Sequence, residues 1–188
     1  MKTLVSKRLI LRDLNINDLV PFYSYARKPN IGPNAGWKPH TSIEESSKIL
    51  KMMISDKEVW GIELKSTNQL IGTIGLHVRN FDNAVNNVKE VGYVLDDAYW
   101  GQGLMVEAVN AVLDYAFINQ ELDAVFCGHA KHNIQSKRVI EKTNFLYTHT
   151  EPRDHFDGTK VDIMMYELKR LDYLGGKVND KSKNEIRL

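Results

Sequence analysis

Hydrophobic and polar residues alternate with a period of two in several short segments of the chain. Residues 8–13 place leucine and isoleucine between charged residues, and residues 59–64 carry Trp60, Ile62 and Leu64 on one face. Such alternation is typical of strands with one buried face. Further strands are predicted at residues 70–78, 90–95, 125–128, 145–150 and 161–168.

Other segments repeat their hydrophobic residues with the 3.6-residue period of a helix. Ile43, Leu50 and Ile54 fall on one face of such a segment, and Ser42 and Glu45 form a capping box at its start. Helices are therefore predicted at residues 17–27, from residue 42 onward, at residues 105–116 and from residue 133 onward. Loops are predicted at residues 29–40, which contain three prolines and two glycines, at residues 81–87 and at residues 151–160.

The predicted element order, β-α-α-β-β-β-α-β-α-β-β, indicates an α/β (α+β) protein. The strand–helix–strand unit from Val91 to Gly128 predicts one parallel pair of strands. We expect a single domain at residues 1–170, because a chain of 188 residues suits one hydrophobic core. Residues 171–188 are rich in glycine, lysine and aspartate and are predicted to be a polar, frayed C-terminal tail.

Composition narrows the class of protein. The 25 Lys and Arg residues balance 24 Asp and Glu residues, and a formal net charge of +1 gives no electrostatic signature of nucleic acid or an anionic membrane. Cys127 is the single cysteine, which excludes an internal disulfide and a multi-cysteine zinc site. No apolar run approaches the roughly 20 residues of a membrane span, and residues 1–8 lack the apolar stretch of a signal peptide, so we expect a cytoplasmic protein.

One strand-to-helix junction carries a clear chemical signal. Gly101 and Gly103 lie where the helix is predicted to begin, and backbone N–H groups are unpaired at such a helix start. Glycine lets a phosphate approach these groups without a Cβ in the way. We therefore expect this junction to bind a pyrophosphate. The alternative is that the two glycines form an ordinary tight turn with no ligand. A P-loop would need Gly-Lys-Ser/Thr, and a Rossmann fingerprint would open the first strand–helix unit, so neither motif fits.

A second informative helix is predicted to begin at Asn133. Asparagine is a favourable N-cap residue, and this start puts Ser136 at the third helical position. Taken alone, the pattern also describes an ordinary capped helix on the protein surface.

Together, the two stretches resemble the GNAT superfamily of acetyl-CoA-dependent N-acetyltransferases, and more narrowly its ribosomal-protein-alanine N-acetyltransferase (RimJ/RimL-type) branch. The resemblance covers residues 8–168. The matching blocks are Ser6-Lys7-Arg8-Leu9-Ile10-Leu11-Arg12, Ile71-Gly72-Thr73-Ile74-Gly75, Gly92-Tyr93-Val94-Leu95, Trp100-Gly101-Gln102-Gly103, Glu107-Ala108, and the helix with Asn133, Ser136, Val139, Glu141, Lys142 and Phe145. The fold implied is a mixed, mostly antiparallel twisted sheet of about seven strands, flanked by about four helices, whose central parallel strands splay apart.

Three residues depart from the superfamily pattern. Met105 replaces the usual Gly or Ala, but its N–H can still face a phosphate. Ile140 stands where many relatives outside this branch carry a tyrosine acid, so a proton donor must come from elsewhere. Asn144 replaces the usual glycine and tolerates the left-handed conformation that a helix end often needs.

The resemblance implies direct transfer of an acetyl group from acetyl-CoA to a primary amine, which is either a protein N-terminus or a small molecule, without a metal. The backbone of the strand at Tyr93 would pair with the pantetheine amides like an added strand, and the N–H groups after Gly101 would hold the pyrophosphate. The implied cofactor-binding residues are Tyr93, Val94, Leu95, Trp100, Gly101, Gln102, Gly103, Leu104, Met105, Val106, Asn133 and Ser136.

The resemblance also implies roles for single side chains. Ser136, at a helix N-terminus, would protonate the leaving thiolate or donate a hydrogen bond to it, and Asn133 would cap the helix, contact the cofactor, or do both. Glu90 is the first candidate for the general base and His77 the second. The acceptor pocket would involve Trp37, His40, His77 and His155.

Two residue types invite other chemistry that we do not expect. Cys127 is predicted to be a small buried strand residue rather than an acyl-carrying nucleophile. His129 and His132 are spaced like metal ligands, but no third partner follows them in sequence.

Two other functions stay open on the sequence alone. Ile140 at the tyrosine position favours a noncatalytic module that binds acyl-CoA or regulates. An interaction domain with no CoA site is the third reading. Edge strands of this superfamily often pair between subunits, which allows a homodimer.

Overall fold

The structure is a computed structural model that describes residues 1–78 and 87–185, with side chains as far as residue 177. The loop predicted at residues 81–87 therefore lies, except for Asn87, outside the described residues. The strands are β1 (Leu4–Val5), β2 (Leu9–Asp13), β3 (Val59–Leu64), β4 (Gln69–Val78), β5 (Val88–Leu95), β6 (Ala124–Ala130), β7 (Leu146–Asp154) and β8 (Lys160–Lys169). The α-helices are α1 (Leu19–Ala26), α2 (Ile43–Asp56), α3 (Leu104–Asp114), α4 (Ile134–Lys142) and α5 (Arg170–Glu185). The short helical turns are η1 (Ile16–Asp18), η2 (Pro33–Ala35), η3 (Asp97–Tyr99) and the π-helical η4 (Tyr115–Asn119).

Within the described part of the chain, eight strands form one sheet in the order β1-β2-β3-β4-β5-β6-β8-β7. Every neighbouring pair is antiparallel except β5 and β6, which confirms the one parallel pair that the crossover through α3 predicts. The mixed sheet agrees with the predicted fold class, with one strand and one helix more than expected. None of the described helices has both the length and the hydrophobicity needed to cross a membrane.

The parallel pair is short, and this shapes the centre of the sheet. β5 and β6 pair at Val88 with Ala124, at Lys89 with Val125 and at Glu90 with Phe126. Farther along, β5 pairs with β4 alone and β6 pairs with β8 alone. The two central strands therefore diverge after three residue pairs, which is the splay that the resemblance implies.

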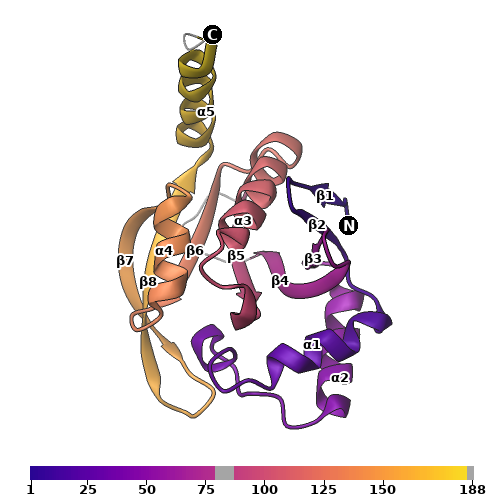
Figure 1. Cartoon of the computed structure of the whole chain (residues 1–188). Coiled ribbons are helices and arrows are strands. Elements are labelled where there is room, and N and C mark those ends of the chain that lie inside the picture. Colours follow the sequence, from indigo (N-terminus) through magenta and orange to yellow (C-terminus); the bar gives the residue numbers. More distant parts are fainter. Residues whose placement is uncertain (79–86, 186–188) are drawn as a thin grey trace.

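Helices cover both faces of the sheet, with α3 and α4 on one face and α1 and α2 toward the other (Figure 1). Alternate residues of β5 serve these two faces, as a strand requires. Val91 and Leu95 are buried in a core shared with α3, and Tyr93 packs against that core. Val94 packs against the second core, which contains Phe22 and Leu50 of α1 and α2. The face covered by α3 and α4 is called the donor face below, and the opposite one the acceptor face.

Two predicted segments differ from the structure. β7 continues to Asp154, into the predicted loop at residues 151–160, because Asp154 pairs with Lys160 across the hairpin. α5 occupies the segment predicted as a frayed tail, and it extends away from the sheet (Figure 1). Its first turns are held by contacts far away in sequence: Tyr173 Oη donates to Asp114 Oδ1 at 3.1 Å, and the rings of Tyr173 and Phe117 lie 5.0 Å apart. The division of the chain at residue 170 stays a prediction.

Candidate active site

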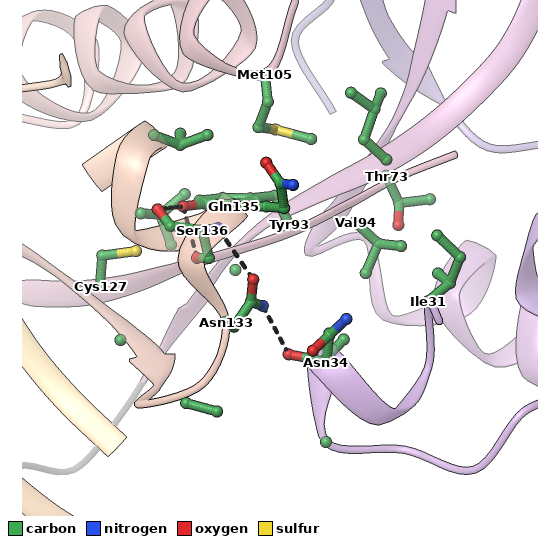
Figure 2. Close-up of a pocket in the computed structure, with 18 of the residues that line it drawn as sticks. Ile31, Asn34, Thr73, Tyr93, Val94, Met105, Cys127, Asn133, Gln135 and Ser136 are labelled. Atoms are coloured by element: carbon green, nitrogen blue, oxygen red, sulfur yellow. Dashed lines mark hydrogen bonds between the residues drawn. The ribbon is translucent and has the colours of Figure 1, made fainter. Parts of the chain in front are cut away.

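A cavity of about 590 Å³ opens where β5 and β6 diverge. It is lined by residues of β4, β5, β6 and β7, by the turn η2, and by the first residues of α3 and α4. Tyr93, Met105, Cys127 and Ser136 border it on the donor side, and Thr73 and Val94 border it on the acceptor side (Figure 2). The gap between the strands is thus open space that reaches both faces of the sheet.

The N-terminus of α3 is shaped to receive an anion. Gly103 is the N-cap residue, with φ +73°, and no side chain caps the helix. Gly101 has φ +76°, and a Cβ there would meet no atom within 4 Å. Both glycines and the first three residues of α3, residues 104–106, line the cavity. Unpaired N–H groups at the positive end of the helix dipole are therefore exposed to it, which fits a pyrophosphate.

Arg8 and Glu107 hold this glycine loop in place. Arg8 Nη1 donates to the carbonyl oxygen of Gln102 at 3.0 Å, and its Nε donates to Glu107 at 2.7 Å. Burial raises the pKa of the Glu107 carboxyl, but hydrogen bonds from Arg8 and from Ser6 outweigh burial and lower this pKa overall. The sequence reading did not assign these two residues a role. Their opposite charges within two separate motif blocks are the signal that could have paired them.

The N-terminus of α4 is capped by a side chain, as predicted. Asn133 Oδ1 accepts from the backbone N–H of Ser136 at 3.0 Å, which places Ser136 at the third helical position. Asn133 Nδ2 donates to the carbonyl oxygen of Asn34 in η2 at 3.0 Å (Figure 2). Asn133 therefore ties α4 to the loop that borders the acceptor side of the cavity.

The hydroxyl of Ser136 meets a second hydroxyl. Tyr93 Oη and Ser136 Oγ share a hydrogen bond of 3.0 Å (Figure 2). Burial raises the pKa of the Tyr93 phenol well above its ordinary value, so this group stays neutral. Ile140, at the expected tyrosine position, is instead buried in the core and does not line the cavity. The structure thus supplies a tyrosine hydroxyl beside Ser136 from β5 rather than from α4.

Cys127 also lines the cavity, and its environment is unsuited to nucleophilic catalysis. The side chain is 1% exposed, and burial raises the pKa of its thiol to about 12. Since the thiolate is the reactive form, Cys127 stays an inert thiol at neutral pH. This confirms the expectation of a buried strand residue.

The acceptor face carries two titratable side chains in adjacent strands. The Glu90 carboxylate accepts from Arg153 at 3.1 and 3.4 Å. The His77 Nδ1 lies 3.1 Å from Glu58 Oε2. Both Glu90 and His77 line the cavity. The structure therefore brings both candidate bases to one surface, each already in contact with a charged partner.

The other predicted site residues fall into two groups. The cavity is lined by the remaining predicted residues Leu95, Trp100, Leu104, Val106, Trp37 and His155, but not by Gln102 or His40. Gln102 turns its side chain toward the carbonyl oxygen of Ala98. His40 is buried, with Nδ1 2.7 Å from Ser46 Oγ and its ring against Phe22. Its predicted contact with the acceptor is therefore replaced by a place in the core beneath Trp37.

Two further expectations concern His129 and Asn144. His129 is buried, with Nδ1 2.8 Å from its neighbour's carbonyl oxygen and Nε2 3.3 Å from Tyr166 Oη. Among the described residues, no group of three or more His, Cys, Asp or Glu side chains is placed to hold a metal. Asn144 has φ +63°, the left-handed conformation that its place after α4 predicts.

Comparisons with known proteins agree with this architecture. The profile of the acetyltransferase (GNAT) domain family matches residues 8–146. An uncharacterized N-acetyltransferase, p20 of Bacillus licheniformis, is 27% identical over 182 residues, which cover 93% of this chain and 100% of p20. The spermidine N-acetyltransferase of Vibrio cholerae, solved with CoA and spermine, shares the fold with a TM-score of 0.74 and 22% identity, over 89% of this chain and 98% of that one.

The ribosomal-protein-S5-alanine acetyltransferase of Vibrio fischeri shares the fold with a TM-score of 0.70 and 21% identity, over 92% of this chain and 99% of that one. At these identities the two solved structures speak for the fold alone. The sequence profile covers most of the chain and includes both helix starts that border the cavity. This protein is an acetyltransferase that belongs to the GNAT family.

Proposed function

We propose that this acetyltransferase transfers an acetyl group from acetyl-CoA to a primary amine, by direct attack within a ternary complex. The observation that carries the proposal is the cavity between β5 and β6, which has an uncapped glycine helix start on one side of the sheet and charged side chains on the other. Such a passage brings two substrates together from opposite faces, and orientation of this kind supplies much of the catalysis in a two-substrate reaction.

The donor side offers acetyl-CoA backbone groups of β5 and α3, and Arg138 and Lys142 of α4 also line the cavity. No strand that the structure describes pairs with residues 91–95 of β5 on the side of β6, so the backbone groups of residues 91–95 are available to the pantetheine amides. The first N–H groups of α3 would hold the pyrophosphate. A backbone N–H near Leu95 would polarise the thioester carbonyl.

The departing sulfur would meet the N-terminus of α4. We assign Ser136 as the hydrogen-bond donor to the thiolate, since its hydroxyl borders the cavity and the helix dipole favours negative charge there. The neutral Tyr93 hydroxyl lies 3.0 Å from Ser136 Oγ and also donates to the Ser136 carbonyl oxygen at 3.3 Å. We assign Tyr93 as the donor in the contact between the two hydroxyls, which would leave the Ser136 proton free to point at the sulfur. Asn133 fixes the helix start that presents Ser136. Glu90 and His77 are the two groups that could take the proton of the amine.

The acceptor class is the finer part of the proposal. The two Vibrio proteins are named for acetylation of spermidine and of ribosomal protein S5, so small and protein amines are both acceptors on this fold. We favour the ribosomal-protein (RimJ/RimL-type) branch, because two of its motif blocks meet through the ion pair of Arg8 with Glu107.

The test is a measurement of thiol release from acetyl-CoA with a panel of amines. The panel contains peptides with different N-terminal residues, spermidine, free amino acids and an aminoglycoside, and CoA binding is measured by calorimetry on the same preparation. We expect micromolar to millimolar binding of CoA and turnover with at least one class. Binding without turnover on any amine would favour the noncatalytic module. No heat and no thermal shift at millimolar CoA would favour the interaction domain.

A further inference from the structure

The ring of His77 lies on the floor of the cavity on the acceptor face. β4 and β5 pair His77 with Glu90 and Gly75 with Gly92, so these four positions share one face of the sheet. A Cβ on Gly75 would lie 2.2 Å from His77 Nε2, and a Cβ on Gly92 would lie 3.9 Å from it. The imidazole therefore folds back over two glycines that leave it room, and it stays partly exposed to solvent.

One nitrogen of this ring is already held by a carboxylate. His77 Nδ1 donates to Glu58 Oε2 at 3.1 Å. The backbone of Glu58 is held beside His77, because the Glu58 carbonyl oxygen accepts from the backbone N–H of Leu76, the neighbour of His77. A histidine that donates through Nδ1 keeps its lone pair on Nε2. Within residues 1–78 and 87–185, no protein group is hydrogen-bonded to that Nε2, which lies over Gly75 in the cavity lining.

Glu90, the alternative base, is engaged differently. Both of its carboxylate oxygens accept from the guanidinium of Arg153, which also donates to Glu151. Among the described residues, the charged groups near His77 are Glu58 just before β3, Glu90 of β5 and, beyond Glu90, Arg153 of β7. Proton transfer to Glu90 would require this ion pair to open, whereas Nε2 of His77 requires no such change.

We propose that His77 is the general base of the reaction and that Glu58 is its positioning residue. The inference rests on the proposed function. An ammonium that enters from the acceptor face gives one proton to Nε2 and becomes a neutral amine. Its nitrogen then forms the bond to the thioester carbon, the bond from carbon to sulfur breaks, and the leaving sulfur takes a proton through Ser136 or from solvent. The second proton of the nitrogen goes to water. The His77 side chain is 42% exposed and can return its own proton to solvent.

The first experiment compares full-length wild type with His77→Gln, using an acceptor found in the amine screen. At about pH 7 we expect kcat to fall by at least about 100-fold, while the affinity for CoA is unchanged. The defect should shrink as the pH rises toward the pKa of the acceptor amine, because bulk water then supplies the neutral amine. Glu58→Gln should lower kcat by about tenfold, since it weakens one hydrogen bond to a charged group.

The structure offers a matched control. His149 on β7 pairs with Glu151 at 3.3 Å and does not line the cavity, so His149→Gln should leave kcat unchanged. If wild type is active and His77→Gln keeps its full rate, the inference is wrong while the proposed function stands. A loss that is equal at every pH would also overturn it, because it would indicate a structural role. If wild type binds CoA and acetylates no amine, the proposed function itself fails.

Discussion

The N-termini of α3 and α4 face one cavity and treat their unpaired N–H groups in opposite ways. α3 begins at Gly103, which has no side chain, and no side-chain cap hydrogen bond is formed there within the described part of the chain. α4 begins at Asn133, whose side chain accepts from the N–H of Ser136. Both helix ends carry the same positive dipole. The N-cap residue thus decides what a helix start offers to the cavity. Glycine leaves the N–H groups of α3 available to a ligand, whereas the Asn133 side chain occupies one N–H of α4 and fixes the position of the Ser136 hydroxyl.

The largest expected effect is on CoA affinity, and it comes from placing a side chain at the uncapped N-terminus of α3. Gly103→Asp places a Cβ and a negative charge where we expect the pyrophosphate, so the affinity for CoA should fall by at least about 100-fold. Calorimetric titration with CoA measures this. Gly158→Asp is the matched control, since Gly158 also has a positive φ, +82°, has open space around it, and does not line the cavity. Equal CoA affinities of Gly103→Asp and Gly158→Asp would contradict an anion site at the N-terminus of α3.

Removal of the Ser136 hydroxyl at the capped N-terminus of α4 should have a smaller effect, and this effect should be on kcat. Ser136→Ala should lower kcat by about ten- to a hundredfold through loss of a hydrogen bond to a charged sulfur, with little change in CoA affinity. Steady-state kinetics together with CoA titration separate the two quantities. An unaltered kcat would exclude Ser136 from the chemistry.

Tyr93→Phe sharpens the same point. Tyr93 is expected to act through Ser136. The kcat of a variant with both Tyr93→Phe and Ser136→Ala should therefore be no lower than the kcat of Ser136→Ala alone. A double-mutant cycle on kcat measures this coupling. Losses that simply add would mean that Tyr93 acts independently of Ser136.

Removal of the cap of α4 should act mainly on stability. Asn133→Ala should lower the free energy of unfolding by about 1 kcal/mol, as measured by urea denaturation. Asn133→Asp keeps the acceptor for the Ser136 N–H but has no donor for the carbonyl oxygen of Asn34. We therefore expect near-normal stability and a changed KM for the amine in that variant. Equal stabilities of wild type and Asn133→Ala would contradict the capping role.

The smallest effect concerns pH and the loop that Asn133 holds. Trp37 at the end of this loop lies against His40, with ring centroids 5.0 Å apart. Burial lowers the pKa of His40, so the native state favours its neutral form. The stability that this neutral form contributes is present above the unfolded pKa, about 6.5, and is lost as the pH falls below it. The free energy of unfolding of His40→Gln should therefore decrease less than that of wild type between about pH 7.5 and pH 5.5. Parallel pH dependences would show that His40 does not contribute.

The sequence predicts most of the fold because its signals are local. Period-two segments become strands, the crossover from Val91 to Gly128 becomes the parallel pair, and Asn133 becomes a cap. α5 could not be predicted, since contacts of Tyr173 with Asp114, 59 residues away, hold a segment that is polar in composition. Ser42 caps α2 as expected by accepting from the Glu45 N–H, but the Glu45 carboxylate accepts from Thr41 rather than from the Ser42 N–H that a capping box would use.

The site was predictable where glycines and caps mark it, and unpredictable where side chains meet across the fold. Tyr93 reaches Ser136 over 43 residues of sequence. Glu58 and His77 are 19 residues apart on neighbouring segments, and no sequence period relates them. His40 looked like a loop residue beside Trp37, but the fold turns it into the core.

β5 carries a further consequence, because seven residue pairs fix it against β4. A one-residue slip of β5 against β4, such as an insertion or deletion could cause, would turn Tyr93 to the side of the amine and Glu90 to the side of α3, so that each substrate would meet the groups meant for the other. β5 is therefore expected to tolerate substitutions but no change in length. A change in the amine that the enzyme accepts would then be expected to arise from changes in the loops that border the cavity rather than from changes in the length of β5.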